Sequence, residues 1–249
     1  MDFFNEFNRF YATSQTSPFP HRLNARYQAI IANNAAAFAG KKILDIASHD
    51  GRWTFAALAA GAAYVKGIEP RQDLIDNAVA TFNHYDIAHP RYEFACGDVF
   101  DLLRGEAFDI VLCLGFYYHT VRHAELLDRI ERTGAQLVII DTEVTPAVDE
   151  LPLQGSQDPR LTFQNPYGIQ LIREPVDNQQ MACVDSLTRN GQTLVGRPSR
   201  AAIQFMADHF GYASSKYDWP AHFLAHPEHA EAMHDYHEGW RETFYLRKS

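Results

Sequence analysis

The sequence predicts an α/β protein with a Rossmann-like, seven-stranded, mostly parallel sheet. First, apolar runs alternate with helical segments five times between residues 43 and 141, which is typical of parallel sheets. Second, the run Phe108 to Gly115 is almost continuously apolar, as a central strand buried on both faces requires. Third, residues 41–70 follow the order strand, turn, helix and strand, and such a βαβ unit makes its two strands parallel.

The composition favours one large domain and argues against several classes of protein. A chain of 249 residues with 46% apolar residues can bury a full core. The net charge of −9 disfavours nucleic acid as a partner, because an acidic chain has no general attraction for polyphosphate. The longest apolar run, residues 55–65, is too short to span a membrane, and the first twenty residues contain no apolar leader. The three cysteines form no CxxC pair, so we expect them to be reduced in a cytoplasmic protein.

Helices are predicted before the first strand. Aromatic side chains recur at helical spacing in residues 2–13, which predicts an amphipathic helix, and a second helix is predicted over residues 21–38 after Pro18 and Pro20. Residues 1–40 would then form a helical cap on a domain spanning residues 41–249. We expect the aromatic stripe to pack against the core; the alternative is a lid over a ligand.

The rest of the chain continues the alternation with one interruption. Residues 142–198 are rich in Pro, Gln, Asn and Asp, and this stretch is too long for an ordinary connection, so we expect an inserted segment that covers the site. Short β-like runs occur in it at residues 168–172 and 181–184. The other predicted helices cover residues 53–60, 71–85, 99–103, 123–133, 199–210 and 222–237, and the other predicted strands cover residues 91–96, 135–141, 212–219 and 240–247.

The turn after the first strand distinguishes between two cofactor classes. Ligands of parallel sheets bind beyond the carboxyl ends of the strands, where this turn and Glu69 fall. A nicotinamide-binding turn has the pattern GxGxxG. Here Ala47 and His49 occupy glycine positions of that pattern, so the nicotinamide fingerprint is missing.

The segment Leu44-Asp45-Ile46-Ala47-Ser48-His49-Asp50-Gly51 instead resembles motif I of the class I S-adenosylmethionine (SAM)-dependent methyltransferases. Other landmarks of that family occur in the same order along the chain. They are Glu69 at the end of the second strand, Gly97-Asp98 after the third, Phe108-Asp109-Ile110-Val111 at the start of the fourth, and the late segment from Arg197 to Tyr212. The resemblance covers residues 38–142 and 195–249.

The resemblance implies that the chain binds SAM. Glu69 would accept hydrogen bonds from both ribose hydroxyls, and Asp98 would accept one from the adenine amino group. The chain departs from the family pattern at Ala47 and His49, where glycine is usual, which leaves a non-catalytic SAM-binding module as an alternative. The resemblance assigns cofactor binding to Asp45, Ala47, Ser48, Gly51, Glu69, Pro70, Asp98 and Leu114.

The exit of the fourth strand, residues 114–119, lies where this family places acceptor-side groups. His119 is the predicted general base, because an imidazole accepts a proton at neutral pH; the alternative is a hydrogen-bonded histidine that shapes the pocket. The segment is similar to an L-Y-H element of methyltransferases related to the tRNA wobble-uridine carboxymethyl-transfer group, which includes many small-molecule O-methyltransferases.

The acidic charge favours the small-molecule enzymes of that group. We therefore predict O-methylation of a hydroxyl on a small polar acceptor, such as a sugar or secondary metabolite. Modification of tRNA is the alternative, and it would require scattered arginines to gather into one basic patch. These arginines are Arg22, Arg26, Arg71, Arg122, Arg129 and Arg132.

Two groups of residues suggest metal ligands. Asp141 and Glu143 lie two apart on an extended chain, so they point the same way, and with His119 nearby they could hold Mg²⁺. We favour the interpretation that both carboxylates are exposed to solvent at the end of a strand. Histidines 222, 226 and 229 share one helical face, but Pro227 interrupts it and no cysteine or HExxH pattern accompanies them, which favours a structural or rim role. The sequence leaves open whether the chain forms a homo-oligomer.

Overall fold

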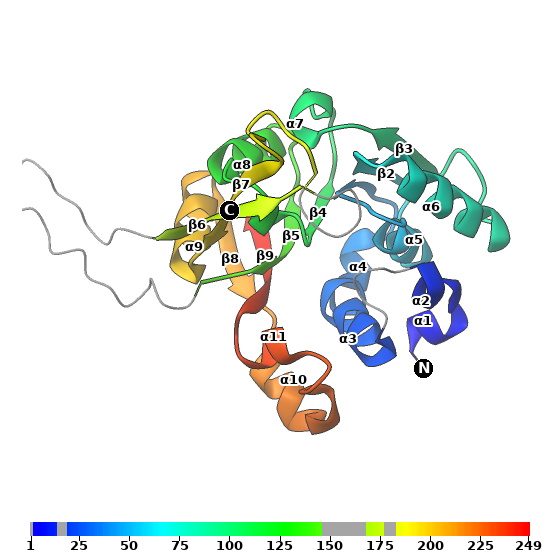
Figure 1. Ribbon diagram of the computed structural model, residues 1–249. Coiled ribbons are helices and arrows are strands. Elements are labelled where there is room, and N and C mark those ends of the chain that lie inside the picture. Colours follow the sequence, from blue (N-terminus) through cyan, green and yellow to red (C-terminus); the bar gives the residue numbers. More distant parts are fainter. Residues whose placement is uncertain (1, 14–18, 146–167, 177–182) are drawn as a thin grey trace, which may run out of the picture.

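The computed structural model describes residues 2–13, 19–145, 168–176 and 183–249 (Figure 1). Its main sheet has seven strands in the order β3-β2-β1-β4-β5-β9-β8, which confirms the predicted class. Only β9 runs antiparallel to its neighbours in that sheet. The strands are β1 (Lys42–Ile46), β2 (Tyr64–Glu69), β3 (Tyr92–Cys96), β4 (Ile110–Leu114), β5 (Leu137–Glu143), β8 (Tyr212–Lys216) and β9 (Arg241–Lys248).

Both faces of the sheet are buried. Successive side chains of a strand point to opposite faces, so Ile43 of β1 packs in one core cluster and Leu44 in the other. The first cluster contains residues of α5 (Arg52–Ala59) and of the N-terminal helices. The second contains residues of α8 (His123–Glu131) and α9 (Arg200–His209). Because both faces are covered, ligands reach the sheet at its strand ends.

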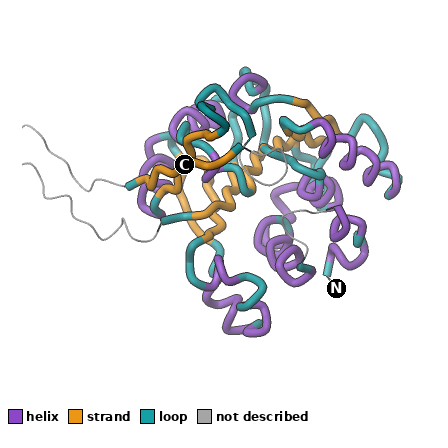
Figure 2. The backbone as a smooth tube through the Cα atoms, viewed as in Figure 1, coloured by secondary structure: helices purple, strands orange, loops and turns teal. Residues whose placement is uncertain are grey.

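The helices between the strands begin and end close to their predicted positions (Figure 2). Ser199, after Pro198, caps α9, because its hydroxyl accepts a hydrogen bond from the amide of Ala202 at 3.1 Å. The remaining two helices of this set are α6 (Gln72–His84) and α7 (Val99–Leu102).

The N-terminal helices are shorter than predicted. The single helix predicted over residues 2–13 is wrong, because α1 (Phe3–Glu6) and α2 (Arg9–Thr13) are separate. The break falls at Phe7, whose φ of −108° and ψ of 53° are not helical, and the Asn24 side chain accepts a hydrogen bond from the amide of Phe4, at the start of α1, at 2.9 Å. The second predicted helix divides into α3 (Pro20–Ile30), the 3₁₀ helix η1 (Ala32–Asn34) and α4 (Ala35–Phe38).

The aromatic stripe packs in the core. Phe4 and Phe10 are fully buried and lie in the cluster that contains Phe55 of α5. The rings of Phe10 and Phe55 meet edge to face, with 5.2 Å between their centroids. The stripe therefore fastens the N-terminal helices to the sheet.

The described part of the insertion forms a second, two-stranded sheet. In it β6 (Ile169–Pro175) pairs antiparallel with β7 (Gln192–Pro198), which the sequence did not predict as a strand. The β-like run predicted at residues 181–184 lies partly outside the described residues, and its residues 183 and 184 are not in a strand. Gly196 donates to the carbonyl of Thr120 at 3.1 Å, so β7 rests directly on the segment that follows β4. A Cβ at Gly196 would lie 2.8 Å from the His123 ring, which makes glycine necessary there.

The histidine-rich stretch is not one helix. It divides into α10 (Trp219–Ala225), η4 (Pro227–His229) and α11 (His234–His237), because Pro227 cannot continue α10 and instead begins the 3₁₀ turn. Trp219 and Tyr236 pack with Ala25 and Ala29 of α3 in a third core cluster. None of the described helices is both long and apolar enough to cross a membrane.

Candidate functional site

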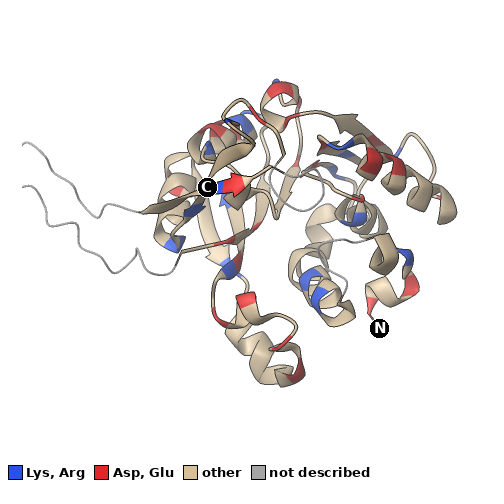
Figure 3. Cartoon of the chain, viewed as in Figure 1, with Lys and Arg blue, Asp and Glu red and all other residues tan. Residues whose placement is uncertain are grey.

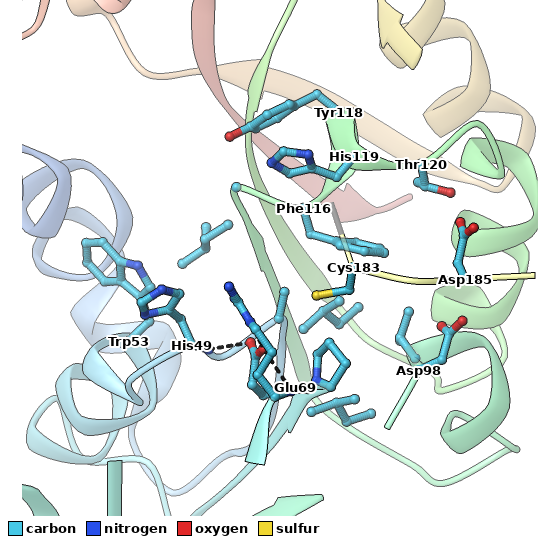
Figure 4. Close-up of a pocket in the computed structure, with 18 of the residues that line it drawn as sticks. His49, Trp53, Glu69, Asp98, Phe116, Tyr118, His119, Thr120, Cys183 and Asp185 are labelled. Carbon is cyan, nitrogen blue, oxygen red and sulfur yellow. Dashed lines mark hydrogen bonds and ion pairs between the residues drawn. The ribbon is translucent and has the colours of Figure 1, made fainter. Parts of the chain in front are cut away.

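A cavity of about 250 Å³ opens at the carboxyl ends of β1, β2 and β4 (Figure 4). One part of its wall comes from the turn after β1, the end of β2 and the residues after β3. The opposite part comes from the 3₁₀ helix η2 (Tyr117–His119) and from α3, and residues 183–185 of the insertion add a further side. The cavity thus lies where parallel sheets bind their ligands.

Glu69 ends β2 with its carboxylate buried at the cavity. Its Oε2 accepts a hydrogen bond from the amide of His49 at 3.0 Å, and its Oε1 accepts from Nε of Arg71 at 2.7 Å. A carboxylate offers about four lone-pair sites, so Oε2 retains capacity for a ligand donor. Figure 4 shows Glu69 and His49 joined by a dashed line on this wall.

In the turn after β1, two residues that are not glycine adopt the left-handed backbone conformation that favours glycine. Ala47 has φ 56° and His49 has φ 54°, and both line the cavity. A side chain in this region costs roughly 1–2 kcal/mol per residue, so the packed turn imposes the conformation. These are the two positions where the sequence departs from the family pattern, and the backbone there takes a left-handed path nonetheless.

The predicted cofactor residues fall into two groups. Ala47, Glu69, Pro70, Asp98 and Leu114 line the cavity. Asp45, Ser48 and Gly51 are buried and are not part of the cavity wall.

The three buried residues support the turn. A Cβ at Gly51 would lie 2.8 Å from the Phe94 ring, so that position needs glycine to bring the turn against α6 and β3. Oδ2 of Asp45 accepts a hydrogen bond from the Thr54 hydroxyl at 2.7 Å, while Oδ1 has no partner among the described atoms. Asp45 therefore ties β1 to α5 behind the cavity.

Burial raises the pKa of Asp45 to about 7, against the opposing effect of its hydrogen bond with Thr54. A raised carboxyl pKa means that the folded chain holds a proton that the unfolded chain releases, so the stability linked to Asp45 is lost as the pH rises from about 4 to 7. In Asp45→Asn this loss should disappear. We expect the variant to gain up to about 4 kcal/mol relative to wild type between pH 4 and pH 8, at about 1.36 kcal/mol per pKa unit. Urea unfolding of both proteins at the two pH values measures the difference, and equal pH dependence would contradict it.

Asp98 follows β3 and caps α7. Its Oδ1 accepts a hydrogen bond from the amide of Phe100 at 2.9 Å, which fixes the carboxylate at the start of the helix. Figure 4 places Asp98 on the same side of the cavity as Glu69. The two carboxylates thus come from neighbouring strands, since β2 pairs with β3.

His119 lies on the opposite part of the wall and has a partner that the sequence did not reveal. Its Nδ1 is 2.7 Å from Oε2 of Glu174 on β6, and both side chains are mostly buried. The two residues are 55 positions apart, and only the pairing of β6 with β7 over η2 brings them together. Neither spacing nor composition could have indicated Glu174.

A different histidine holds the pocket segment in shape. Nε2 of His123 lies 3.0 Å from the carbonyl oxygen of Tyr117 and 3.1 Å from that of Gly196, so a protonated Nε2 donates to both. Burial lowers the pKa of His123 to about 4, and its ring is neutral at pH 7. His123 therefore bridges η2 and β7, while His119 reaches the cavity.

The predicted metal ligands are held by arginines. Asp141 is fully buried, so the expected solvated strand end is wrong for this residue. Arg26 and Arg241 each donate to its Oδ1 at 3.1 Å, and the Tyr236 hydroxyl donates to Oδ2 at 2.8 Å. Although burial raises the pKa of Asp141, the two guanidinium groups bring it below its ordinary value.

Glu143 is likewise ion-paired, with Arg197 and with Arg241. Two carboxylates whose charge is neutralised by three arginines do not fit a divalent cation, because the guanidinium groups would repel it.

Residues 43–135 match the family model described as a methyltransferase domain. No curated protein matches the chain closely enough to count as a relative. Among solved structures, the N-terminal domain of EvdMO1 in the presence of SAH and D-fucose is similar, with TM-score 0.61 and 17% identity over 90% of this chain and 82% of that one.

Two further solved structures share the fold. The DhpI–SAH complex has TM-score 0.58 and 14% identity, over 98% of this chain and 94% of that one. The [4+2]-cyclase SpnF has TM-score 0.55 and 14% identity, over 99% and 93% of the two chains. A cyclase among the neighbours means that the fold by itself does not fix the reaction.

Proposed function

We propose that this chain is a class I SAM-dependent methyltransferase that transfers the methyl group of SAM to a hydroxyl of a small polar acceptor, such as a sugar or secondary metabolite; the match of residues 43–135 to a methyltransferase domain and the shared fold support the family. The observation that carries the proposal is His119 on the cavity wall, opposite the carboxylates of Glu69 and Asp98, with Glu174 as the partner of its Nδ1. A proton acceptor and a nucleoside site would thus face one another across one cavity.

The cavity has groups that suit each part of SAM. The carboxylates of Glu69 and Asp98 would accept hydrogen bonds from the ribose hydroxyls and the adenine amino group. The left-handed turn at Ala47 and His49 would pass beside the methionine part. Arg26 also lines the cavity; one of its amino groups pairs with Asp141, but its buried Nε has no hydrogen-bond partner among the described atoms and could donate to the carboxylate of that amino-acid tail. SAM would then point its sulfonium toward η2.

The proposed reaction is an in-line displacement. The acceptor oxygen forms a bond to the methyl carbon, the bond between that carbon and sulfur breaks, and S-adenosylhomocysteine (SAH) leaves with the electron pair. The hydroxyl proton passes to Nε2 of His119. Glu174 would keep the other proton on Nδ1 and stabilise the imidazolium that forms. Alignment of the acceptor behind the methyl group supplies much of the rate.

Magnesium has no part in this proposal. Asp141 and Glu143 are occupied by arginines, so the residues predicted to hold Mg²⁺ do not suit it, and His119 has Glu174 as its partner. The base alone accounts for removal of the proton.

Modification of tRNA is the less favoured alternative. Figure 3 shows basic and acidic residues interspersed over the elements. Arginines that neutralise carboxylates of their own chain are poorly suited to neutralise phosphates. All six arginines that such a patch would need are ion-paired: Arg22 with Asp235, Arg26 with Asp141, Arg71 with Glu69, Arg122 and Arg129 with Glu125, and Arg132 with Asp128.

We also propose that residues 1–40 act as a cap on the methyltransferase domain at residues 41–249, since Arg22 and Arg26 of α3 reach the cavity. The cytoplasmic location stays a prediction.

Calorimetric titration with SAH, followed by assays of SAH formation from SAM with a panel of hydroxylated acceptors, tests the proposed function. Sugars including D-fucose should head the panel, because EvdMO1 was solved in its presence. SAH binding together with turnover on one acceptor class supports the proposal. SAH binding with no turnover on any acceptor would favour a non-catalytic SAM-binding module, and absence of SAH binding would reject the cofactor assignment.

Replacing Glu174 with glutamine should lower turnover by about 10-fold to 100-fold while SAH affinity stays the same. The amide keeps the size of the side chain but removes the charge that stabilises the imidazolium, and a hydrogen bond to a charged group contributes about 1.5–3 kcal/mol. Steady-state kinetics at saturating SAM measure the effect. Glu6→Gln, a change of an exposed carboxylate outside the cavity, is the control. Unchanged turnover in Glu174→Gln would remove Glu174 from the mechanism.

A further inference from the structure

The stretch after α10 brings two imidazoles and one carboxylate together, away from the cavity. Nδ1 of His226 lies 3.5 Å from Oε1 of Glu228, and Nε2 of His229 lies 3.7 Å from the same oxygen. One ligand atom from each of the three residues falls within 4.8 Å of the others. In the part of the chain that the structure describes, this is the sole group of three or more potential ligands that converges in this way.

We propose that His226, Glu228 and His229 form a binding site for a divalent transition-metal ion, with Zn²⁺ as the best-suited ion. Two neutral imidazoles and a carboxylate are a ligand set typical of Zn²⁺ sites that keep a fourth, open position for water. Softer sulfur ligands are absent from this set, and a site with two imidazole ligands does not suit Mg²⁺ or Ca²⁺, which prefer oxygen.

The three ligand atoms would need to move only a short distance toward one another to bind an ion. Bonds of about 2.0–2.1 Å to a tetrahedral ion place neighbouring ligand atoms roughly 3.3 Å apart. Two of the three separations are already 3.5 and 3.7 Å. The side chains of His226 and Glu228 are 51% and 60% exposed, so their rotamers can adjust without disturbing the core.

A second layer of hydrogen bonds orients one ligand. Metal-bound histidines usually donate their other ring N–H to a fixed acceptor, which sets the tautomer. Nδ1 of His229 lies 3.1 Å from Nε2 of His222, and Nδ1 of His222 lies 3.4 Å from the Tyr217 hydroxyl. The His229 side chain is only 15% exposed, and its ring stacks on His21 with 5.1 Å between centroids. The chain Tyr217–His222–His229 therefore leaves Nε2 of His229 to face the other two ligands.

Pro227 creates the site. A continuous helix would carry His226 and His229 on one face but would place residue 228 on another. Because the 3₁₀ helix η4 begins at Pro227, the turn is tighter than a turn of an α-helix. The rings of His226 and His229 stack with their centroids 5.0 Å apart, and Glu228 lies beside them. The feature that argued against a metal in the sequence is thus the one that assembles the ligands.

Calorimetric titration of chelator-treated protein with ZnCl₂ tests the site. Wild type should bind one equivalent in a saturable step. His226→Gln combined with His229→Gln should weaken binding by at least about 10-fold, and His222→Gln alone should weaken it by about 10-fold, as loss of an outer partner does. Zn²⁺ should also raise the thermal unfolding temperature of wild type and leave that of the double variant unchanged.

The chain offers a matched control nearby. His237 lies 3.0 Å from Glu238, and His234 lies 3.9 Å from it, but these side chains form no converging group. His234→Gln combined with His237→Gln should leave the Zn²⁺ titration unchanged. Titration of each variant with SAH verifies that it remains folded. A wild type without a saturable Zn²⁺ step, or a control variant that loses as much affinity as the site variant, would overturn the proposal.

Discussion

Replacing His119 with alanine should lower turnover at saturating SAM by 100-fold or more while the affinity for SAH changes little. General-base catalysis contributes about 10²–10⁴-fold. A second histidine on the cavity wall, His49, has its Nδ1 3.8 Å from Asp50, whereas Nδ1 of His119 lies 2.7 Å from Glu174. The carboxylates of Glu69 and Asp98, which we propose bind the cofactor, lie on the opposite part of the wall, so they should be undisturbed. Steady-state kinetics and SAH calorimetry on the same preparation separate the two effects.

The control is His209→Ala, which removes an exposed histidine at the end of α9. It should behave as wild type in both measurements. If His119→Ala abolishes SAH binding as well as turnover, the assignment of His119 as the base is wrong, and the residue shapes the cofactor pocket instead.

Replacing Glu69 with alanine should weaken SAH binding by about 1.5–3 kcal/mol, the range for hydrogen bonds to a charged group, which corresponds to roughly 10-fold to 150-fold in dissociation constant. Glu69 is fully buried at the end of β2, and its carboxylate also receives the amide of His49. The variant therefore loses the predicted ribose acceptor and one anchor of the turn together. Calorimetry with SAH measures the change.

Glu143→Gln tests whether any carboxylate at a strand end has this effect. Glu143 ends β5 but is not part of the cavity wall, so SAH affinity should be unchanged. Thermal unfolding without ligand shows whether Glu69→Ala remains folded. A folded Glu69→Ala protein that binds SAH like wild type would reject the orientation proposed for the adenosine part.

Much of the fold could be predicted from local pattern. The five alternations up to β5 could be predicted because burial imposes a period of two on half-buried strands and a near-continuous apolar run on central ones. The helix α9 could be predicted because a helix with one buried face repeats its apolar residues every three to four positions. The positions of Glu69, Asp98 and His119 at the cavity followed from one rule, that the carboxyl ends of parallel strands meet at one edge. In residues 2–13 the pattern predicted one helix where the chain forms two, because the spacing of the aromatic residues does not show that the backbone leaves the helical conformation at Phe7.

By itself, the sequence determined the sheet, the turn after β1 at the cavity and the histidine after β4, since each depends on residues close together in the chain. Only the tertiary structure decided the partners of these groups. Glu174 reaches His119 across 55 residues, and two arginines from opposite ends of the chain neutralise Asp141. The physical reason is that hydrogen bonds and ion pairs act over a few ångströms in space, and local periodicity carries no information about which distant side chain will lie within that range.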